Sequence, residues 1–362
     1  MRVTSISIDA FRNLRELSID PAAGVNVICG ENGQGKTNLL EGIWMFTGGR
    51  SFRGAKDAEL VPLGQSAARL SAEFFCGGRD NTAALRFGEK RGAKLNGIDC
   101  PSQQEQAGHF FAAVFSPAHL TLVKGGPAER RRALDAAICQ LKPRYLSVLA
   151  QYNRLLAQRN ALLKDAQLSS MLLDSLETWD QALAKSGGSV TKIRASCVER
   201  LAPLAGAVYG GISNSREQLS MRYLSAVTGP APCGEAELRQ ALRDARGDDL
   251  RTGITSVGPH RDDLELAING LSARIYGSQG QQRSAVLAWK LGECDLIEQV
   301  SGERPVVLLD DVMSELDESR RDYLLHRMDD RQVFITCCDP GQIVGISGEA
   351  VFEIADGRLK NR

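Results

Sequence analysis

The chain has 362 residues, which is enough for two domains and a sizeable core. Lys and Arg together balance Asp and Glu at 44 each, so any surface that attracts nucleic acid or an anionic membrane must be a local basic patch. No stretch approaches the ~20 apolar residues of a membrane span, and the nine cysteines include no CxxC pair. These features predict a cytoplasmic protein with free thiols and no membrane partner.

The first 29 residues are predicted to form β-strands. Apolar residues at positions 3, 6 and 8 indicate one short strand, and those at 17 and 19 indicate the next. The run Val25–Cys29 stands between two glycines and is typical of a buried strand.

A phosphate-binding pattern, GxxxxGK[ST], follows this buried strand and precedes a predicted helix over residues 37–46. Its glycines allow backbone N–H groups to converge on phosphates, Lys36 adds a charge at the β- and γ-phosphates, and the Thr37 hydroxyl is a ligand for Mg²⁺. The predicted ligands are therefore ATP and Mg²⁺, and the alternative is a glycine turn without a ligand. The predicted ATP-binding residues are Gly30, Glu31, Asn32, Gly33, Gln34, Gly35, Lys36 and Thr37.

The middle of the chain divides into two kinds of pattern. Residues 69–115 alternate between apolar and polar and predict a meander of strands at 70–75, 83–87, 93–95 and 112–115. From residue 128 to about 215, three-to-four spacing predicts long helices broken at Pro143, near 167–170 and at Gly187-Gly188. A strand at 219–223 and a polar stretch at 229–249 close this segment. We therefore predict an N-terminal part of an ATPase head at 1–126, an inserted helical lobe at 127–249 and the C-terminal part of the head at 250–362.

Two further motifs lie in the C-terminal part. The apolar strand 305–309 ends in Asp310 and Asp311, which suit Mg²⁺ binding and polarisation of an attacking water, although alone such a pair is often a solvated turn. Upstream, an SxGQ segment opens a helix and offers a second anion-binding cradle, with an ordinary Ser/Gly N-cap as the alternative. Its residues are Ser278, Gln279, Gly280 and Gln281.

Together these motifs and the segment Val312–Asp317 resemble the ABC-type ATPase heads of SMC and Rad50 proteins, in which SxGQ is the signature that caps the γ-phosphate held by a partner subunit. Further sequence motifs, taken in their order along essentially the whole chain, resemble those of the RecF family of bacterial DNA replication and repair proteins. These motifs are Ala10–Asn13, Phe115–Pro117, Val123–Asp135, Gln158–Asn160 and Gly258–Leu264.

The resemblance implies an α/β P-loop head like that of Rad50, with a compact helical lobe in place of a long coiled coil. It implies an ATP-dependent homodimer, binding to junctions of single- and double-stranded DNA, and slow, DNA-dependent ATP hydrolysis. It also implies the mediators RecR and RecO as partners, and roles in loading recombinase, gap repair and the SOS response. The chain departs from the pattern at Leu14, where the family commonly has an aromatic residue, and at Cys337-Cys338, where many ABC ATPases have a His.

Several charged residues have two interpretations. Arg12 is predicted to contact a nucleotide phosphate, as in related heads, with a surface ion pair as the alternative. Arg130, Arg131 and Arg132 are candidates for DNA phosphates, but they point in different directions on one helix turn, and a merely solvated run is the alternative. His260 is predicted to be structural rather than a phosphate or DNA contact.

The predicted mechanism is an ATP-gated clamp. ATP on the P-loop is closed over by the signature of a second copy, and Lys36, Asp310 and Asp311 support hydrolysis that releases the clamp. A transporter ATPase would place its signature much sooner after the P-loop, and a P-loop kinase would not need it. A long coiled-coil SMC protein would need a longer, unbroken insert.

Overall fold

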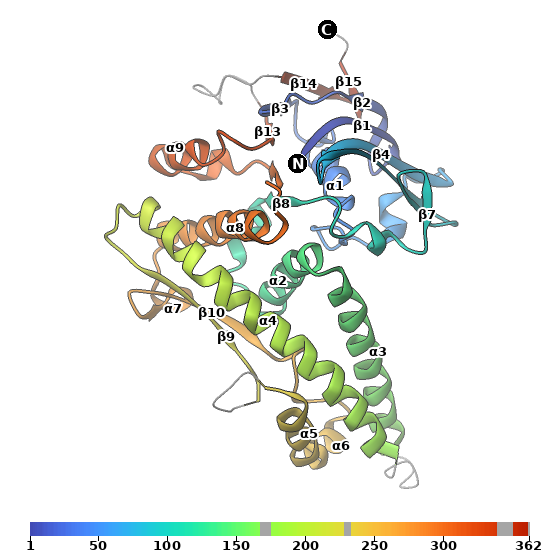
Figure 1. Ribbon diagram of the computed structural model, residues 1–362, viewed down its shortest axis with the longest axis vertical. Coiled ribbons are helices and arrows are strands. Elements are labelled where there is room, and N and C mark those ends of the chain that lie inside the picture. The colour runs from blue at the N-terminus through green and yellow to red at the C-terminus, as the bar shows by residue number, and fades with distance from the viewer. Residues whose placement is uncertain (167–174, 228–232, 339–349, 361–362) are drawn as a thin grey trace.

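The computed structural model describes residues 1–166, 175–227, 233–338 and 350–360, and its centre is a largely parallel sheet (Figure 1). Strand order is β15-β14-β3-β13-β12-β8, and only the edge strand β15 runs antiparallel to its neighbour. Both faces are covered, so side chains alternate between two cores: Val307 and Leu309 lie in one and Leu308 in the other. The strands are β3 (Val25–Cys29), β8 (Ala112–Phe115), β12 (Val306–Leu309), β13 (Val333–Cys337), β14 (Ala350–Ala355) and β15 (Arg358–Leu359).

A second, antiparallel sheet packs over one face, with helix α1 (Lys36–Met45) between the two sheets. Leu39, Leu40 and Ile43 of α1 are buried there with apolar side chains of both sheets. Strand order is β2-β1-β4-β5-β6-β7. The strands are β1 (Arg2–Phe11), β2 (Leu14–Ile19), β4 (Ala67–Cys76), β5 (Arg79–Gly88), β6 (Gly92–Leu95) and β7 (Ile98–Cys100).

One strand of the predicted meander belongs elsewhere. Residues 112–115 form β8, which pairs in parallel with β12 in the central sheet, so their placement in the meander is wrong. All four residues are buried, which is the pattern of a strand covered on both faces rather than of a half-exposed antiparallel one.

The helical segment extends away from the sheets as α2 (Pro127–Leu141), α3 (Pro143–Ala166) and α4 (Leu176–Ile212), with α5 (Glu235–Asp244) and α6 (Arg246–Thr252) at its far end (Figure 1). The predicted break at Gly187-Gly188 is wrong, because α4 continues through both glycines. The polar stretch 229–249, for which the sequence pattern predicts no element, contains α5 and the start of α6. The predicted link near 167–170 lies outside the described residues.

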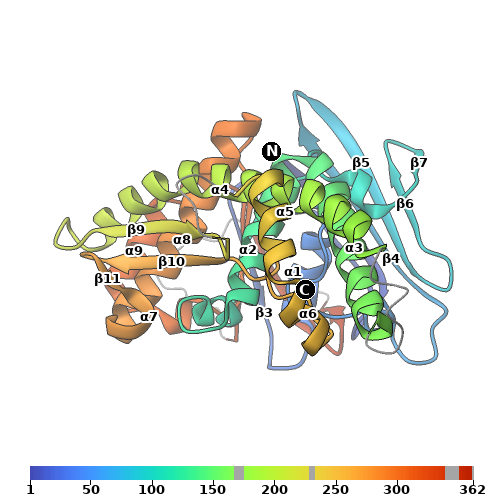
Figure 2. The same cartoon turned by 90° about the horizontal axis from the view of Figure 1, so that it is seen from below.

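The chain returns through a three-stranded sheet, β11-β10-β9, in which β9 (Leu219–Leu224) pairs antiparallel with β10 (Asp263–Ile268). This ribbon lies on the opposite side of the molecule from the antiparallel sheet (Figure 2). After β11 (Leu271–Ser272) come α7 (Ala273–Tyr276), α8 (Gln279–Ser301) and α9 (Glu318–His326). Short 3₁₀ turns lie at Asp57–Leu60, Gln103–Gln106, Pro117–Thr121 and Met313–Glu315. In the described part of the chain, no helix is long and apolar enough to cross a membrane.

Candidate nucleotide site

The P-loop lies between β3 and α1, at the edge of the central sheet where its parallel strands end. Its glycines carry the turn: φ is 147° at Gly30, 81° at Gly33 and 117° at Gly35, values that side chains rarely allow. A Cβ on Gly35 would lie 2.5 Å from Leu14 Cδ2, and one on Gly30 would collide with the Ile354 carbonyl. The sequence therefore uses glycine here for both conformation and close packing.

Lys36 folds back over this loop. Its Nζ donates to the carbonyl oxygens of Gly30 at 2.6 Å and Glu31 at 3.0 Å, and the residue is only 8% exposed. The ammonium group is thus held over the backbone that is predicted to surround the phosphates.

Thr37 and Asp310 come together across 273 residues of sequence. The Thr37 hydroxyl donates to Asp310 Oδ1 at 2.7 Å, and Thr336 Oγ1 on β13 donates to the same oxygen at 3.1 Å. Burial raises the pKa of Asp310 above its usual range, although these two hydrogen bonds oppose the shift. The neighbouring Asp311 is exposed, has a φ of 51°, and donates its backbone N–H to Thr336 Oγ1 at 2.9 Å.

Cys338 occupies the place next to the P-loop where many ABC ATPases have a His. Its thiol is exposed and donates to Asn32 Oδ1 at 3.2 Å, and its sulfur lies 3.6 Å from Lys36 Nζ. The thiol therefore contacts two P-loop side chains, which the sequence alone did not indicate.

The signature residues lie away from the P-loop of their own chain. Ser278 is the N-cap of α8, and its hydroxyl accepts from the Gln281 N–H at 3.2 Å. In both views α7, which leads into Ser278, is well separated from α1, which follows the P-loop (Figures 1 and 2). The P-loop and the SxGQ segment therefore lie at separate places in the chain.

Comparisons with known proteins agree with this geometry. A model of the AAA domain matches residues 5–107. The DNA replication and repair protein RecF of Heliobacterium modesticaldum is 43% identical over 93% of this chain and 92% of its own length, and that of Gloeobacter violaceus is 40% identical over the same shares. The chain belongs to the RecF family.

Solved structures extend the comparison to the whole fold. The recombination mediator protein RecF-ATP in the RecFOR pathway has a TM-score of 0.90 and 36% identity, covering 99% of this chain and 97% of its own. An SMC head domain from Pyrococcus furiosus has a TM-score of 0.54 at 14% identity. The predicted ABC-type head of the Rad50 and SMC kind is therefore confirmed as the fold of this RecF-family chain.

A polar network that the sequence did not predict supports the P-loop of this RecF-family member. Asn13, in the turn between β1 and β2, donates to the Gly33 carbonyl at 2.6 Å and accepts from Asn38 at 2.6 Å. Asn38 accepts in turn from the exposed Arg53 at 2.8 Å. In the sequence, Asn13 was marked only by its place in the motif Ala10–Asn13.

Arg12 forms an ion pair, as in the alternative to a phosphate contact, but its partner is buried rather than at the surface. Its Nε and Nη2 donate to the fully buried Glu41 at 3.0 and 2.9 Å, and its Nη1 donates to the Glu59 carbonyl at 3.2 Å. The carboxylate of Glu41 also accepts from Ser51. All three guanidinium nitrogens are thus directed at protein atoms.

The three consecutive arginines of α2 have three different environments. Arg130 is 2% exposed, makes a two-pronged ion pair with Asp263 at 2.7 and 2.9 Å, and donates to the Gly125 carbonyl at 2.7 Å. The prediction that Arg130 contacts DNA is therefore wrong, because its side chain is buried in this ion pair. Arg131 is half-buried and donates to the Asp262 carbonyl at 2.5 Å, whereas Arg132 is exposed.

His260 has a structural environment. A carbonyl oxygen can only accept, so Nε2 donates to Thr255 O at 2.9 Å and Nδ1 accepts from the Tyr152 hydroxyl at 2.6 Å. Burial lowers the pKa of His260, which favours this neutral form.

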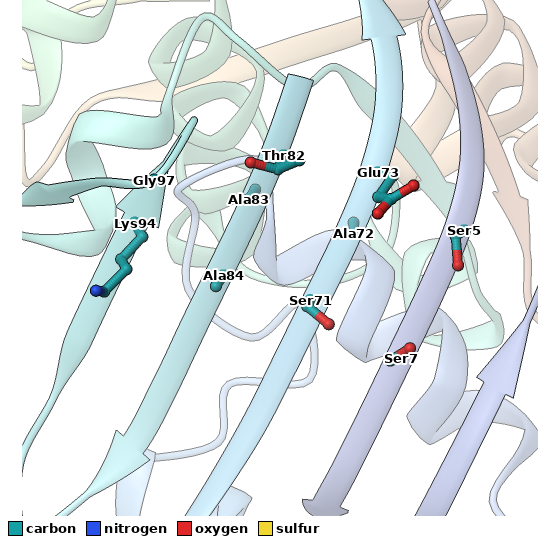
Figure 3. Close-up of a pocket in the computed structure, with 10 residues that line it drawn as sticks. All are labelled: Ser5, Ser7, Ser71, Ala72, Glu73, Thr82, Ala83, Ala84, Lys94 and Gly97. Carbon is teal, nitrogen blue, oxygen red and sulfur yellow. The ribbon is translucent and has the colours of Figure 1, made fainter. Parts of the chain in front are cut away.

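The chain also has a shallow hollow on the outer face of the antiparallel sheet (Figure 3). None of the predicted site residues lines it. Its lining is mainly small side chains, with one carboxylate and one ammonium group, and includes Ser5, Ser7, Ser71, Glu73, Thr82 and Lys94.

Proposed function

We propose that this chain binds ATP between two copies of itself and uses that switch in DNA replication and recombinational repair. The observation that carries the proposal is the contact between Thr37 and Asp310 beside the P-loop, in a chain whose signature lies elsewhere. Membership in the RecF family and similarity to the protein described as RecF-ATP support ATP as the nucleotide.

Mg²⁺ fits the residues beside the P-loop. A hydroxyl and a carboxylate oxygen are the hard ligands that Mg²⁺ prefers, and Mg²⁺ usually takes only one or two carboxylates together with substrate phosphates. In the described ranges, no cluster of three His, Cys, Asp or Glu residues could hold a metal alone, so the phosphates must complete this site. Burial raises the pKa of Asp310, and a cation bound beside this carboxylate would favour its ionised form. Bound there, Mg²⁺ would neutralise phosphate charge.

The partner for the signature is a second copy of the chain. Ser278 and Gly280 stand at the N-terminus of the 23-residue helix α8, where backbone N–H groups favour an anion. Three large apolar side chains, Leu271, Ile275 and Tyr276, are 58%, 71% and 68% exposed beside them. Such a cluster next to an anion cradle suits a protein interface with a phosphate at its edge.

Hydrolysis would release the two copies. Asp311 is exposed after the end of β12, next to Asp310. In this proposal it polarises the attacking water, while Lys36 stabilises charge on the phosphates. Other ABC ATPases usually have a Glu at the position of Asp311, and the shorter reach of Asp fits slow turnover. Replacing Asp311 by Asn should give a protein that still dimerises but hydrolyses ATP poorly, and normal turnover in this variant would remove Asp311 as the catalytic carboxylate.

The proposed substrate of the clamp is DNA at junctions of single and double strands, with RecR and RecO as protein partners, in recombinase loading and the SOS response. The similarity to a mediator of the RecFOR pathway supports this assignment. A gel shift on gapped DNA with and without ATP tests it directly. Binding that does not depend on ATP would contradict the clamp.

Sedimentation with and without ATP tests the dimer. The wild type should dimerise only with ATP, and Ser278→Arg should bind ATP but stay monomeric because the larger, charged side chain enters the interface. Lys36→Met should lose both ATP binding and dimerisation. Its affinity for ATP should be at least about tenfold weaker, because a charged hydrogen-bond donor is removed. Lys90→Met, on an exposed loop, is the matched control. A Ser278→Arg protein that still dimerises with ATP would show that the signature assignment is wrong.

A further inference from the structure

Gln281 of the signature is held by a residue of the helical segment. Its Nε2 donates to Glu217 Oε1 at 2.7 Å, and its Oε1 accepts from the Ser278 N–H at 2.8 Å. The other oxygen of Glu217 accepts from the hydroxyl of Tyr209, which is fully buried on α4, at 2.7 Å. One carboxylate thus joins α4 to the turn that begins α8.

The turn after α4 is built to present Glu217. Asn214 and Ser215 have φ values of 52° and 59°, so two successive left-handed residues reverse the chain directly after the helix. The Ser215 N–H donates to the Gly210 carbonyl at 2.7 Å, which closes the reversal. Non-glycine residues rarely adopt this conformation in succession, and here it brings Glu217 back against Tyr209.

The carboxylate of Glu217 is ionised in this arrangement. The hydrogen bond from Tyr209, followed by that from Gln281, lowers its pKa. A charged acceptor makes a stronger bond to the Gln281 amide than a neutral one. The amide is therefore fixed in the orientation in which its oxygen caps Ser278.

Helix α4 connects this point to the far end of the molecule. It spans 37 residues, and its other end lies beside α5 and α6 (Figure 1). Tyr323 of α9 packs against Gly211 near its C-terminus. Helix α4 also packs along the body of α8, where a Cβ on Gly292 would lie 2.8 Å from the Ala205 nitrogen, so Tyr209 and Glu217 add a polar link from the end of α4 to the turn that begins α8.

We propose that Glu217 is a positioning residue through which the helical segment sets the signature turn for a second copy of the chain. This inference rests on the proposed function, since it assumes that the signature faces a second copy. Glu217 does not touch the nucleotide of its own P-loop; it acts through Gln281 on Ser278. The structure thus assigns the α4–β9 turn a role in regulating ATP-dependent dimerisation.

Four variants test this: Glu217→Leu, Glu217→Gln, Gln281→Leu and the double variant Glu217→Leu/Gln281→Leu. Glu217→Leu removes the acceptor of both Gln281 and Tyr209, and loss of the bond to Gln281 should weaken the ATP-dependent dimer by roughly 3- to 10-fold and leave ATP binding to the monomer unchanged. Glu217→Gln keeps an acceptor for Gln281 and should be closer to the wild type. The double variant should be no weaker than Gln281→Leu alone. Glu265→Leu removes a half-buried carboxylate that pairs with Arg222 on the neighbouring strand β9, and it is the matched control.

Hydrogen exchange of the nucleotide-free monomer tests whether Glu217 holds the signature turn, independently of whether the chain dimerises. Glu217→Leu should speed exchange of the backbone amides of residues 278–282, and Glu265→Leu should not. Faster exchange in a protein that never dimerises would mean that the proposed function fails while Glu217 still positions the turn. Unchanged exchange, additive effects in the double variant, or a Glu217→Gln variant as defective as Glu217→Leu would each overturn the inference.

Discussion

At the scale of single residues, the nucleotide site keeps charged groups in places that do not favour folding. Asp310 is 6% exposed, its carboxylate accepts hydrogen bonds from two neutral hydroxyls, and burial raises the pKa of its carboxyl group. A buried carboxylate that makes no ion pair among the described residues destabilises the nucleotide-free fold, as expected where function and stability compete. Arg130 shows the opposite case, because its ion pair with Asp263 compensates for its burial.

Replacement of Asp310 by Asn should therefore stabilise the nucleotide-free protein while weakening Mg²⁺-dependent ATP binding. The pKa of Asp310 is higher in the folded chain than in the unfolded chain. At a pH above the folded pKa, ionisation of Asp310 therefore lowers the free energy of unfolding. Below the unfolded pKa of about 3.9 the acid is protonated in both states, and this destabilisation vanishes. The gain in Tm should be present at neutral pH and disappear as the pH falls to that range. Melting curves across this pH range measure the effect. Equal Tm values at neutral pH, or a gain that grows in acid, would contradict the assignment.

At the scale of elements, close packing explains why a helix contains two adjacent glycines. A Cβ on Gly188 would lie 2.7 Å from the Glu235 backbone nitrogen at the start of α5, and one on Gly187 would lie 2.5 Å from Leu238 Cδ2. The glycines weaken α4 locally, but they allow α5 to approach it. Glycine pairs usually indicate a helix end, and only the neighbouring helix shows that these two do not.

Gly188→Ala should destabilise the fold by about 1–3 kcal/mol, because overpacking against a backbone atom outweighs the roughly 1 kcal/mol gained in helix propensity. Gly210→Ala on the same helix has no atom within 4 Å of the added Cβ and should stabilise by about 0.5–1 kcal/mol. Urea unfolding of the two variants gives both values. If Gly188→Ala were as stable as Gly210→Ala, the close approach of α5 would not be what selects glycine.

At the scale of the whole molecule, a chain with no net charge must bind DNA through a local surface. Of the three consecutive arginines, Arg132 is the one that is fully available to a phosphate, since Arg130 is buried and Arg131 is half-buried. The proposed clamp pairs two copies, so each such interaction with a phosphate occurs twice per dimer.

Arg132→Ala should weaken ATP-dependent DNA binding and reduce the slope of log K against log salt by about 0.7–0.9 for each phosphate that the arginine would have neutralised. Titrations at several salt concentrations measure that slope. Arg304→Ala is a suitable control, because this residue pairs with Glu298 just before β12, at the sheet edge opposite the P-loop. An unchanged slope in Arg132→Ala would place the DNA on another surface.

Arg130→Ala should instead lower the free energy of unfolding by about 3–5 kcal/mol, since it leaves Asp263 without its partner.

The sequence by itself determined the local chemistry of this protein: the P-loop, the strand that ends in Asp310, the N-cap at Ser278 and most helices and strands. Such features depend on contiguous residues, since hydrophobic period, glycine and capping residues act over a few positions. It could not assign β8 to the central sheet, keep α4 whole, or find the partners of Arg12, Arg130 and Glu217. These depend on interactions between residues far apart in the chain, and packing decided them: a buried strand pairs where both of its faces are covered, and a buried charge lies where a partner compensates for it.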